Sequence, residues 1–234
     1  MQITKYNNLC IIPARGGSKR IPRKNIKDFL GKPIIAYSID AALKSQLFNE
    51  IMVSTDDEEI AEVARKYGAI VPFMRSKENA NDTATTDDVL NEVVSNLIEN
   101  GFRFENFCCI YPTSPLLSAQ KLRTAYSKMI NDRLNGIFGV TNFSYPIYRG
   151  LLIENGLAKM IWPKNKQKRS QELPNVLHDS GQFYWNTKES FLKNKTLWTN
   201  NTGVLELSNL EVQDIDNETD WKIAELKYKL LNEK

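Results

Sequence analysis

The residues best suited to chemistry are five cations gathered in one short segment behind an apolar run. The apolar run covers residues 9–13, and the segment from Arg15 to Lys24 contains two adjacent glycines, a serine and no acidic residue. Paired glycines allow a backbone to approach a ligand closely and direct N–H groups at an anion. The segment therefore predicts a site for a triphosphate, with its cations at Arg15, Lys19, Arg20, Arg23 and Lys24.

A basic loop that is merely solvated is the alternative interpretation of this segment. It contains neither the Gly-x4-Gly-Lys-Ser/Thr pattern of a P-loop nor the Gly-x-Gly-x-x-Gly pattern of a dinucleotide-binding turn. Its place directly after the first predicted strand favours ligand binding, because ligands bind beyond the carboxyl ends of strands in open α/β sheets.

Two carboxylates near the C-terminus are candidate metal ligands. Asp214 lies in a short predicted strand, 212–215, and Asp216 follows it directly, so in an extended segment these i and i+2 positions should place both side chains on one face. Oxygen ligands of this kind suit Mg²⁺, which keeps waters and shares substrate phosphates. The alternative is that Asp216 or Asn217 caps the following helix, with Glu218 in its first turn.

Histidine and cysteine usage narrows the possible chemistry further. The single histidine, His178, excludes a site with several histidine ligands, and no nucleophile elbow accompanies it. Cys10, Cys108 and Cys109 lie in apolar runs without metal-ligand spacing. We expect them to be reduced core residues of a cytosolic protein.

Short apolar runs alternate with amphipathic stretches through the first 140 residues. This alternation predicts a mostly parallel sheet with helices on both faces. The loops after Pro13, Phe73 and Tyr111 should then hold the ligand. The expected strands are 9–13, 51–54, 69–73, 107–111 and 136–141, and the expected helices are 34–44, 58–67, 86–99 and 118–130.

Beyond residue 140, this alternation of strands and helices is interrupted by one segment and then resumes. Residues 143–180 are aromatic, proline-rich and basic without a clean period, which predicts an insertion, with a β-arm as a candidate form, in a single domain covering 1–234. Its apolar content favours an interface over a plain surface excursion. A strand at 181–186 and a terminal helix at 218–231 are expected to follow.

Bulk properties are those of an ordinary globular protein. A net charge of +3 is too small to indicate a nucleic-acid or membrane partner, and we expect neither. The first apolar run is too short for a signal peptide or a membrane helix. We therefore expect a cytoplasmic protein.

Residues 12–25, IPARGGSKRIPRKN, resemble the signature of the acylneuraminate cytidylyltransferases. The resemblance extends over nearly the whole sequence and implies a Rossmann-like nucleotidyltransferase sheet. It also implies CTP as substrate, Mg²⁺ as cofactor, and transfer of CMP to the anomeric hydroxyl of an acidic nine-carbon sugar with release of pyrophosphate. The Tyr111 motif and residues 178–185 favour the branch that acts on pseudaminic acid.

The resemblance also implies roles for individual residues. Arg15, Lys24 and Asp216 would be catalytic, and Asp214 and Asp216 would hold the metal. The stretch from Arg75 to Thr86 would form the cytosine and ribose pocket, although its cluster Asn81-Asp82-Thr83-Ala84-Thr85-Thr86 also suits a loop that caps the next helix. The implied nucleotide-binding residues are Arg15, Gly16, Ser18, Lys19, Lys24, Asn25, Arg75, Ala84 and Thr86.

The implied sugar contacts are Tyr111, Arg169, Gln182 and Tyr184. Members of the family that act on sialic acid usually carry glutamine where Tyr111 stands, so this position departs from their pattern. The residue matching Arg169 can come from the partner subunit, and the insertion 143–180 resembles the arm that such homodimers exchange.

Three alternatives remain open from the sequence. Two are related enzymes, one acting on sialic acid and one on the eight-carbon sugar of lipopolysaccharide. The third is a nucleotide-sensing protein with a dead site. The intact basic loop and both aspartates favour an active enzyme over that third alternative.

Overall fold

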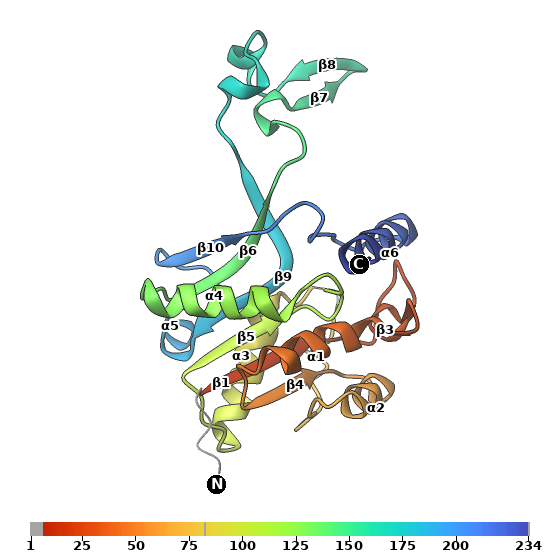
Figure 1. The fold of residues 1–234 in the computed structure, drawn as a ribbon, viewed down its shortest axis with the longest axis vertical. Helices are drawn as coiled ribbons and strands as arrows, with labels where there is room; N and C mark the ends of the chain where they lie inside the picture. The colour runs from red at the N-terminus through yellow and green to blue at the C-terminus, as the bar shows by residue number, and fades with distance from the viewer. Residues whose placement is uncertain (1–6, 82, 234) are drawn as a thin grey trace.

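A central sheet of six strands forms the body of the molecule (Figure 1). The computed structural model describes residues 7–81 and 83–233. β9 runs antiparallel to both of its neighbours, and the remaining pairs are parallel, which confirms the predicted sheet. In spatial order the strands are β10 (Thr202–Glu206), β6 (Gly136–Asn142), β9 (Leu177–Thr187), β5 (Asn106–Ile110), β1 (Asn8–Pro13) and β4 (Glu50–Ser54).

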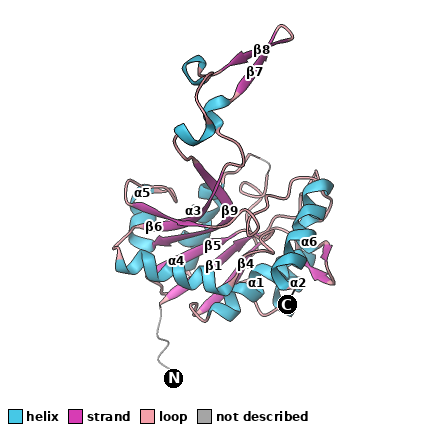
Figure 2. Cartoon of the chain, turned by 45° about the horizontal axis from the view of Figure 1, so that its top comes forward, coloured by secondary structure: helices cyan, strands magenta, loops and turns pink. Residues whose placement is uncertain are grey.

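Helices cover both faces of the sheet, as the alternating pattern predicted (Figure 2). Because side chains alternate along a strand, Cys108 packs into one core and Cys109 into the other. Both thiols, like that of Cys10, are buried and unpaired. One face carries α1 (Ile34–Ser45), α2 (Glu58–Lys66) and α4 (Ala119–Asn131), and the other carries α3 (Thr86–Glu99) and α5 (Lys188–Asn194).

Several predicted elements differ from the observed ones. The expected strand at 69–73 is only an isolated bridge between Met52 and Ile70, since Pro72 has no N–H to extend the pairing. The expected strand at 212–215 is an irregular segment. β9 begins at Leu177, four residues earlier than expected, and α5 and β10 were not predicted.

The C-terminal helix packs against the segment that follows β1. α6 (Glu218–Asn232) packs on the two-stranded hairpin of β2 (Asp28–Phe29) and β3 (Lys32–Pro33), and the Trp221 and Phe29 rings lie 5.5 Å apart. Ile215, only 1% exposed, belongs to the same cluster. The segment around Ile215 is therefore held beside the loop that follows β1.

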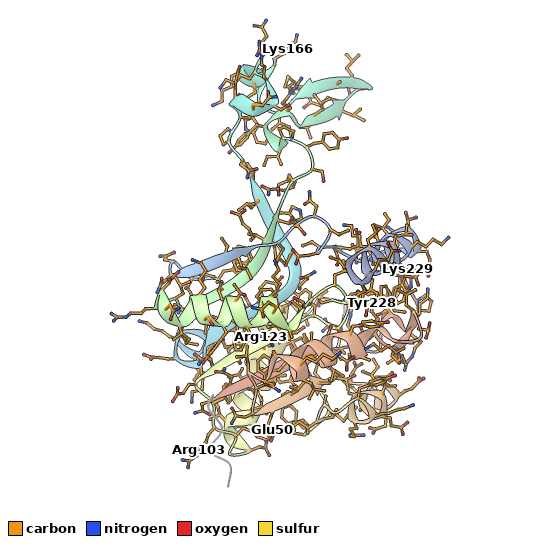
Figure 3. The ribbon with its side chains drawn as sticks, in the orientation of Figure 1. Glu50, Arg103, Arg123, Lys166, Tyr228 and Lys229 are labelled. Carbon is orange, nitrogen blue, oxygen red and sulfur yellow. The ribbon has the colours of Figure 1, made fainter. Side chains whose placement is uncertain are left out.

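The predicted insertion forms an arm that extends away from the sheet (Figure 1). β6 and β9 lead into it, and it carries the hairpin of β7 (Leu151–Glu154) and β8 (Leu157–Met160), with short 3-10 turns at Ile147–Arg149, Pro163–Asn165 and Ser170–Glu172. Lys166 lies at its far end (Figure 3). Within the described residues, no helix combines the length and apolar character that crossing a membrane would require.

Candidate active site

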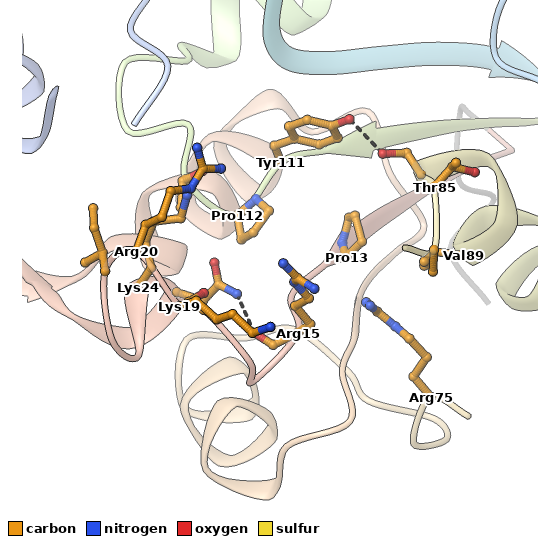
Figure 4. A pocket seen from close by; sticks show the side chains of 16 residues that line it. Pro13, Arg15, Lys19, Arg20, Lys24, Arg75, Thr85, Val89, Tyr111 and Pro112 are labelled. Carbon is orange, nitrogen blue, oxygen red and sulfur yellow. Dashed lines mark hydrogen bonds between the residues drawn. The ribbon is translucent and has the colours of Figure 1, made fainter. Parts of the chain in front are cut away.

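A cavity of about 480 Å³ lies at the carboxyl ends of β1 and β5, where the fold predicts a ligand (Figure 4). Its walls come from the loop after β1, from Arg75 and residues 84–89, and from the turn after β5. The cavity brings together nine of the predicted site residues, namely Arg15, Ser18, Lys19, Lys24, Asn25, Arg75, Ala84, Thr86 and Tyr111.

The first half of the basic loop is anchored by polar contacts. Asn25 Nδ2 donates a hydrogen bond of 2.9 Å to the C=O of Arg15. The N–H of Gly16 is donated to Asp56 Oδ1 at 2.9 Å, so it does not point at a ligand as predicted, and Gly16 does not line the cavity. A Cβ at Gly16 would lie 2.7 Å from Asp57 Oδ2, so the glycine is needed for close packing against the start of α2.

One of the five loop cations supports the loop itself. Arg23 has a positive φ of 55° and forms ion pairs of 2.5 Å with both Asp57 and Glu59. Asp57 is also the N-cap of α2, accepting a hydrogen bond from the N–H of Ile60. The other four cations line the cavity, namely Arg15, Lys19, Arg20 and Lys24.

Lys24 contacts the residue that lies between the two aspartates in the sequence. Its Nζ donates a hydrogen bond of 2.7 Å to the C=O of Ile215. Burial lowers the pKa of Lys24, and the charges of Asp216 and Asp214 oppose that effect. The half-buried ammonium is therefore stabilised as a cation by this carboxylate pair.

The aspartate pair suits a divalent cation, although the predicted strand beneath it is absent. Partial desolvation and the charge of Asp216 raise the pKa of Asp214, so the two carboxylates are close enough to repel each other. Arg20 forms an ion pair of 2.7 Å with Asp216. Asn217, rather than Asp216, caps α6 by accepting hydrogen bonds from the N–H groups of Thr219 and Asp220.

No group of three or more His, Cys, Asp or Glu side chains suited to a metal occurs among residues 7–81 and 83–233. Two carboxylates are nevertheless a sufficient protein contribution for Mg²⁺, which completes its coordination with waters and substrate phosphates. The donors at Asp214 and Asp216 therefore fit this ion.

The segment after residue 73 closes the opposite side of the cavity. Arg75 is buried, and its Nε donates a hydrogen bond of 3.0 Å to Ser54 Oγ at the end of β4. Burial lowers the pKa of this guanidinium. Arg15 reaches across to donate to the C=O of Asn81 at 3.0 Å. Asp82, part of the predicted cluster from Asn81 to Thr86, lies outside the described residues.

The sequence left open whether this segment caps a helix or lines a pocket, and two adjacent threonines, Thr85 and Thr86, do one each. Thr85 is the N-cap of α3 and forms a capping box with Asp88. Thr86 Oγ1 instead lies 2.8 Å from the hydroxyl of Tyr111. The same short segment thus starts a helix and lines the cavity.

A second cavity of about 370 Å³ adjoins the first and shares Tyr111 and Thr113 with it. Tyr184, predicted to contact the sugar, lines this second cavity, as do Asp214 and His178. Asp179 also lines it and was missed, because an isolated aspartate in a polar stretch carries no local signal of a binding role.

Two predicted sugar contacts lie elsewhere. Gln182 is 3% exposed, and its Nε2 donates a hydrogen bond of 2.6 Å to the C=O of Glu211, so the structure places it in the core and outside both cavities. Residues at positions i and i+2 of a strand, such as Gln182 and Tyr184, face the same side only where the strand pairing is regular. The pairing of β9 with β6 is irregular here, so the two side chains have different surroundings. Arg169 is exposed on the arm and lines neither cavity.

Known proteins match this protein over nearly its whole length. A family model described as Cytidylyltransferase matches residues 9–146. A pseudaminic acid cytidylyltransferase of Campylobacter jejuni subsp. jejuni is 44% identical over 97% of this chain and 98% of that protein. A CMP-N,N'-diacetyllegionaminic acid synthase of Legionella pneumophila is 34% identical over 93% of this chain and 94% of that protein.

Solved structures share the fold at lower identity. The structure of a CMP:2-keto-3-deoxy-manno-octonic acid synthetase complexed with CTP matches with a TM-score of 0.69 at 18% identity, covering 97% of this chain and 99% of that one. A 4-diphosphocytidyl-2C-methyl-D-erythritol synthase matches with a TM-score of 0.67 at 12% identity, covering 95% and 98%. Fold, family model and full-length relatives agree, and the chain belongs to the cytidylyltransferase family.

Proposed function

We propose that this protein transfers CMP from CTP to the anomeric hydroxyl of pseudaminic acid and releases pyrophosphate. The observation that carries the proposal is the pair of adjoining cavities, one lined by the basic loop and the other reaching Asp214. The Campylobacter jejuni relative, which is named for this activity, supports it over almost the full length of both proteins.

The first cavity is the place for CTP. Four cations of the loop after β1 line it and offset the negative charge of a triphosphate. Arg75, Ala84 and Thr86 line the other end, where a small side chain and a few polar groups suit a pyrimidine ring and its ribose. The acceptor sugar would then occupy the second cavity, next to Tyr111 and Tyr184.

The reaction forms one bond and breaks one at the α-phosphorus. The anomeric oxygen attacks that phosphorus in line with the departing pyrophosphate, and the hydroxyl proton passes to solvent. Positioning and charge stabilisation supply most of the rate in such transfers. Arg15 and Lys24 would stabilise the charge that develops on the α-phosphate and the leaving group.

Asp214 and Asp216 would hold Mg²⁺ beside the reacting phosphate. When bound there, the ion polarises the α-phosphate and lowers the pKa of the attacking hydroxyl. Binding requires Arg20 to release Asp216, and this exposed ion pair is inexpensive to break. Lys24 would remain between the carboxylates and the phosphates.

A homodimer built on the arm would complete the sugar site. Ile153 is 84% exposed and Leu157 is 72% exposed on the hairpin β7–β8, and apolar exposure of this extent favours a protein partner. Arg169 of the partner subunit would then reach the acceptor. We place the enzyme in the cytoplasm, where CTP is made and where its three free thiols remain reduced.

Pyrophosphate release with CTP, Mg²⁺ and a panel of sugar acids tests the proposal. The panel contains pseudaminic acid, N,N'-diacetyllegionaminic acid, sialic acid and the eight-carbon keto-sugar acid. We expect the highest kcat/KM with pseudaminic acid. Tight CTP binding without pyrophosphate release for any sugar would instead identify a nucleotide-sensing protein.

A further inference from the structure

The second cavity contains a rigidly held carboxylate that none of the proposed steps uses. Asp179 Oδ2 accepts a hydrogen bond of 2.5 Å from the hydroxyl of Tyr184, and Oδ1 accepts one of 2.9 Å from the N–H of Gly181. The side chain is half-buried and lines the cavity. Its orientation is therefore fixed before any ligand arrives.

Asp179 retains capacity to accept further hydrogen bonds. Each oxygen of an ionised carboxylate accepts about two hydrogen bonds, and each Asp179 oxygen accepts one from the described residues. The Nδ1 atom of the neighbouring His178 lies 2.8 Å from the backbone C=O of Asp179, so that ring nitrogen is engaged by the backbone. A ligand in this cavity therefore meets an acceptor-only group.

The charges around the second cavity determine how an acidic sugar lies in it. Of the described residues that line it, two are aspartates, Asp179 and Asp214, and none is lysine or arginine. A sugar carboxylate placed beside Asp179 would be repelled. The sugar must therefore turn its carboxylate elsewhere and present a hydrogen-bond donor to Asp179.

We propose that Asp179 is a specificity residue, whose carboxylate accepts a hydrogen bond from an acylamino N–H of the acceptor sugar. This inference rests on the proposed function. Pseudaminic acid carries an additional acylamino group where sialic acid has a hydroxylated tail, so it offers an additional N–H donor. A fixed charged acceptor rewards a well-placed N–H donor strongly and rejects an analogue with no donor at that position, because the carboxylate is then left desolvated and unpaired.

A variant of Tyr184 can distinguish direct recognition of the sugar by Asp179 from a purely structural role of Asp179. Its ring lies 5.3 Å from that of Tyr111, whose hydroxyl is bonded to Thr86. Asp179 thus also braces the wall between the two cavities through Tyr184. The variant Tyr184→Phe removes the brace and keeps the carboxylate, whereas Asp179→Asn keeps polar atoms that can bond both neighbours and removes the charge.

Calorimetric binding of sugar and of CTP, measured separately and without Mg²⁺, tests the inference. We expect Asp179→Asn to weaken binding of pseudaminic acid roughly 10- to 100-fold, as loss of a hydrogen bond to a charged group does. The affinity for CTP should change by less than about twofold, as should the sugar affinity of the control variant Asp132→Asn, which lies on the exposed end of α4.

An analogue of pseudaminic acid, in which hydrogen replaces the additional acylamino group, completes a double-mutant cycle with Asp179→Asn. The wild type should bind this analogue weakly, and Asp179→Asn should weaken it no further. Unchanged sugar binding in Asp179→Asn would overturn the inference, as would an equal loss in Tyr184→Phe or a wild type that binds no sugar acid. A wild type that binds CTP and sugar without releasing pyrophosphate once Mg²⁺ is added would defeat the proposed function alone.

Discussion

The ammonium of Lys24 donates a hydrogen bond of 2.7 Å to the C=O of Ile215, the residue between Asp214 and Asp216. This contact joins the loop after the first strand to the irregular segment before the last helix. The buried side chain of Ile215, packed with Phe29 and Trp221, holds that segment in place. One lysine thereby connects the cavity for the triphosphate to the carboxylates suited to the metal.

Loss of this lysine should impair turnover much more than folding. We expect Lys24→Ala to lower kcat by about 10²–10³, the usual effect of removing one positioned group that stabilises transition-state charge. The exposed Lys66→Ala on α2 serves as the matched control and should retain full activity. Near-normal kcat in Lys24→Ala, with an unchanged melting temperature, would show that this ammonium is not catalytic.

Activity should be lost at a lower alkaline pH than the ordinary pKa of a lysine would suggest. Burial lowers the pKa of Lys24 from the ordinary value of 10.5, so the ammonium loses its proton, and its ability to stabilise phosphate charge, at a lower pH. A profile of kcat against pH should fall on the alkaline side below that value. Lys24→Arg, which stays charged, should lack this limb whatever its absolute rate. Identical alkaline limbs in both proteins would assign the titration to another group.

Metal binding should require the carboxylate of Asp216, whereas its ion-pair partner Arg20 should compete modestly with the metal. We expect activity to require a divalent cation and Asp216→Asn to remove most of it. In calorimetric Mg²⁺ titrations without CTP, Asp216→Asn should abolish binding. Arg20→Ala should bind up to about fivefold more tightly, since an exposed ion pair of this kind costs at most about 1 kcal/mol to break. Full activity of Asp216→Asn at limiting Mg²⁺ would exclude the aspartate pair as the metal site.

The arm should hold two copies of the protein together. Light scattering of the wild type at micromolar concentration should give the mass of a dimer. The double variant Ile153→Asp and Leu157→Asp places charges on the exposed hairpin and should yield monomers with an intact fold. The same changes should raise the KM for the sugar if Arg169 of the partner subunit contacts it. A monomeric wild type would rule out this interface and any contribution of Arg169 across it.

Local signals predicted the elements of the fold most accurately. Helix α3 was expected at the observed residues, and the structure shows that its start is fixed locally, by a capping box between Thr85 and Asp88. The prediction of a strand at 212–215 was wrong, since the burial of Val212 and Ile215 comes from packing against neighbouring elements and not from strand pairing. Apolar residues in a short segment indicate burial but do not identify their packing partners.

Site residues depended on long-range contacts to different degrees. The basic loop was predictable because its cations and glycines are close together in the sequence. The donation from Gly16 to Asp56 and the hydrogen bond from Gln182 to Glu211 were not, because each joins segments that are remote in sequence. Asp179 was missed for a related reason, since Tyr184 and the cavity give it its role only in the folded protein.

The acceptor preference tests the central claim most directly. The measurement is kcat/KM for pseudaminic acid and for sialic acid at saturating CTP and Mg²⁺. Tyr111 presents a ring with one hydroxyl, already bonded to Thr86, where a glutamine would offer an amide donor and acceptor. Two unreplaced hydrogen bonds from the tail of sialic acid, at about 1–3 kcal/mol each, predict a preference for pseudaminic acid on the order of 10²-fold or more. Equal values, or a preference for sialic acid, would contradict the account.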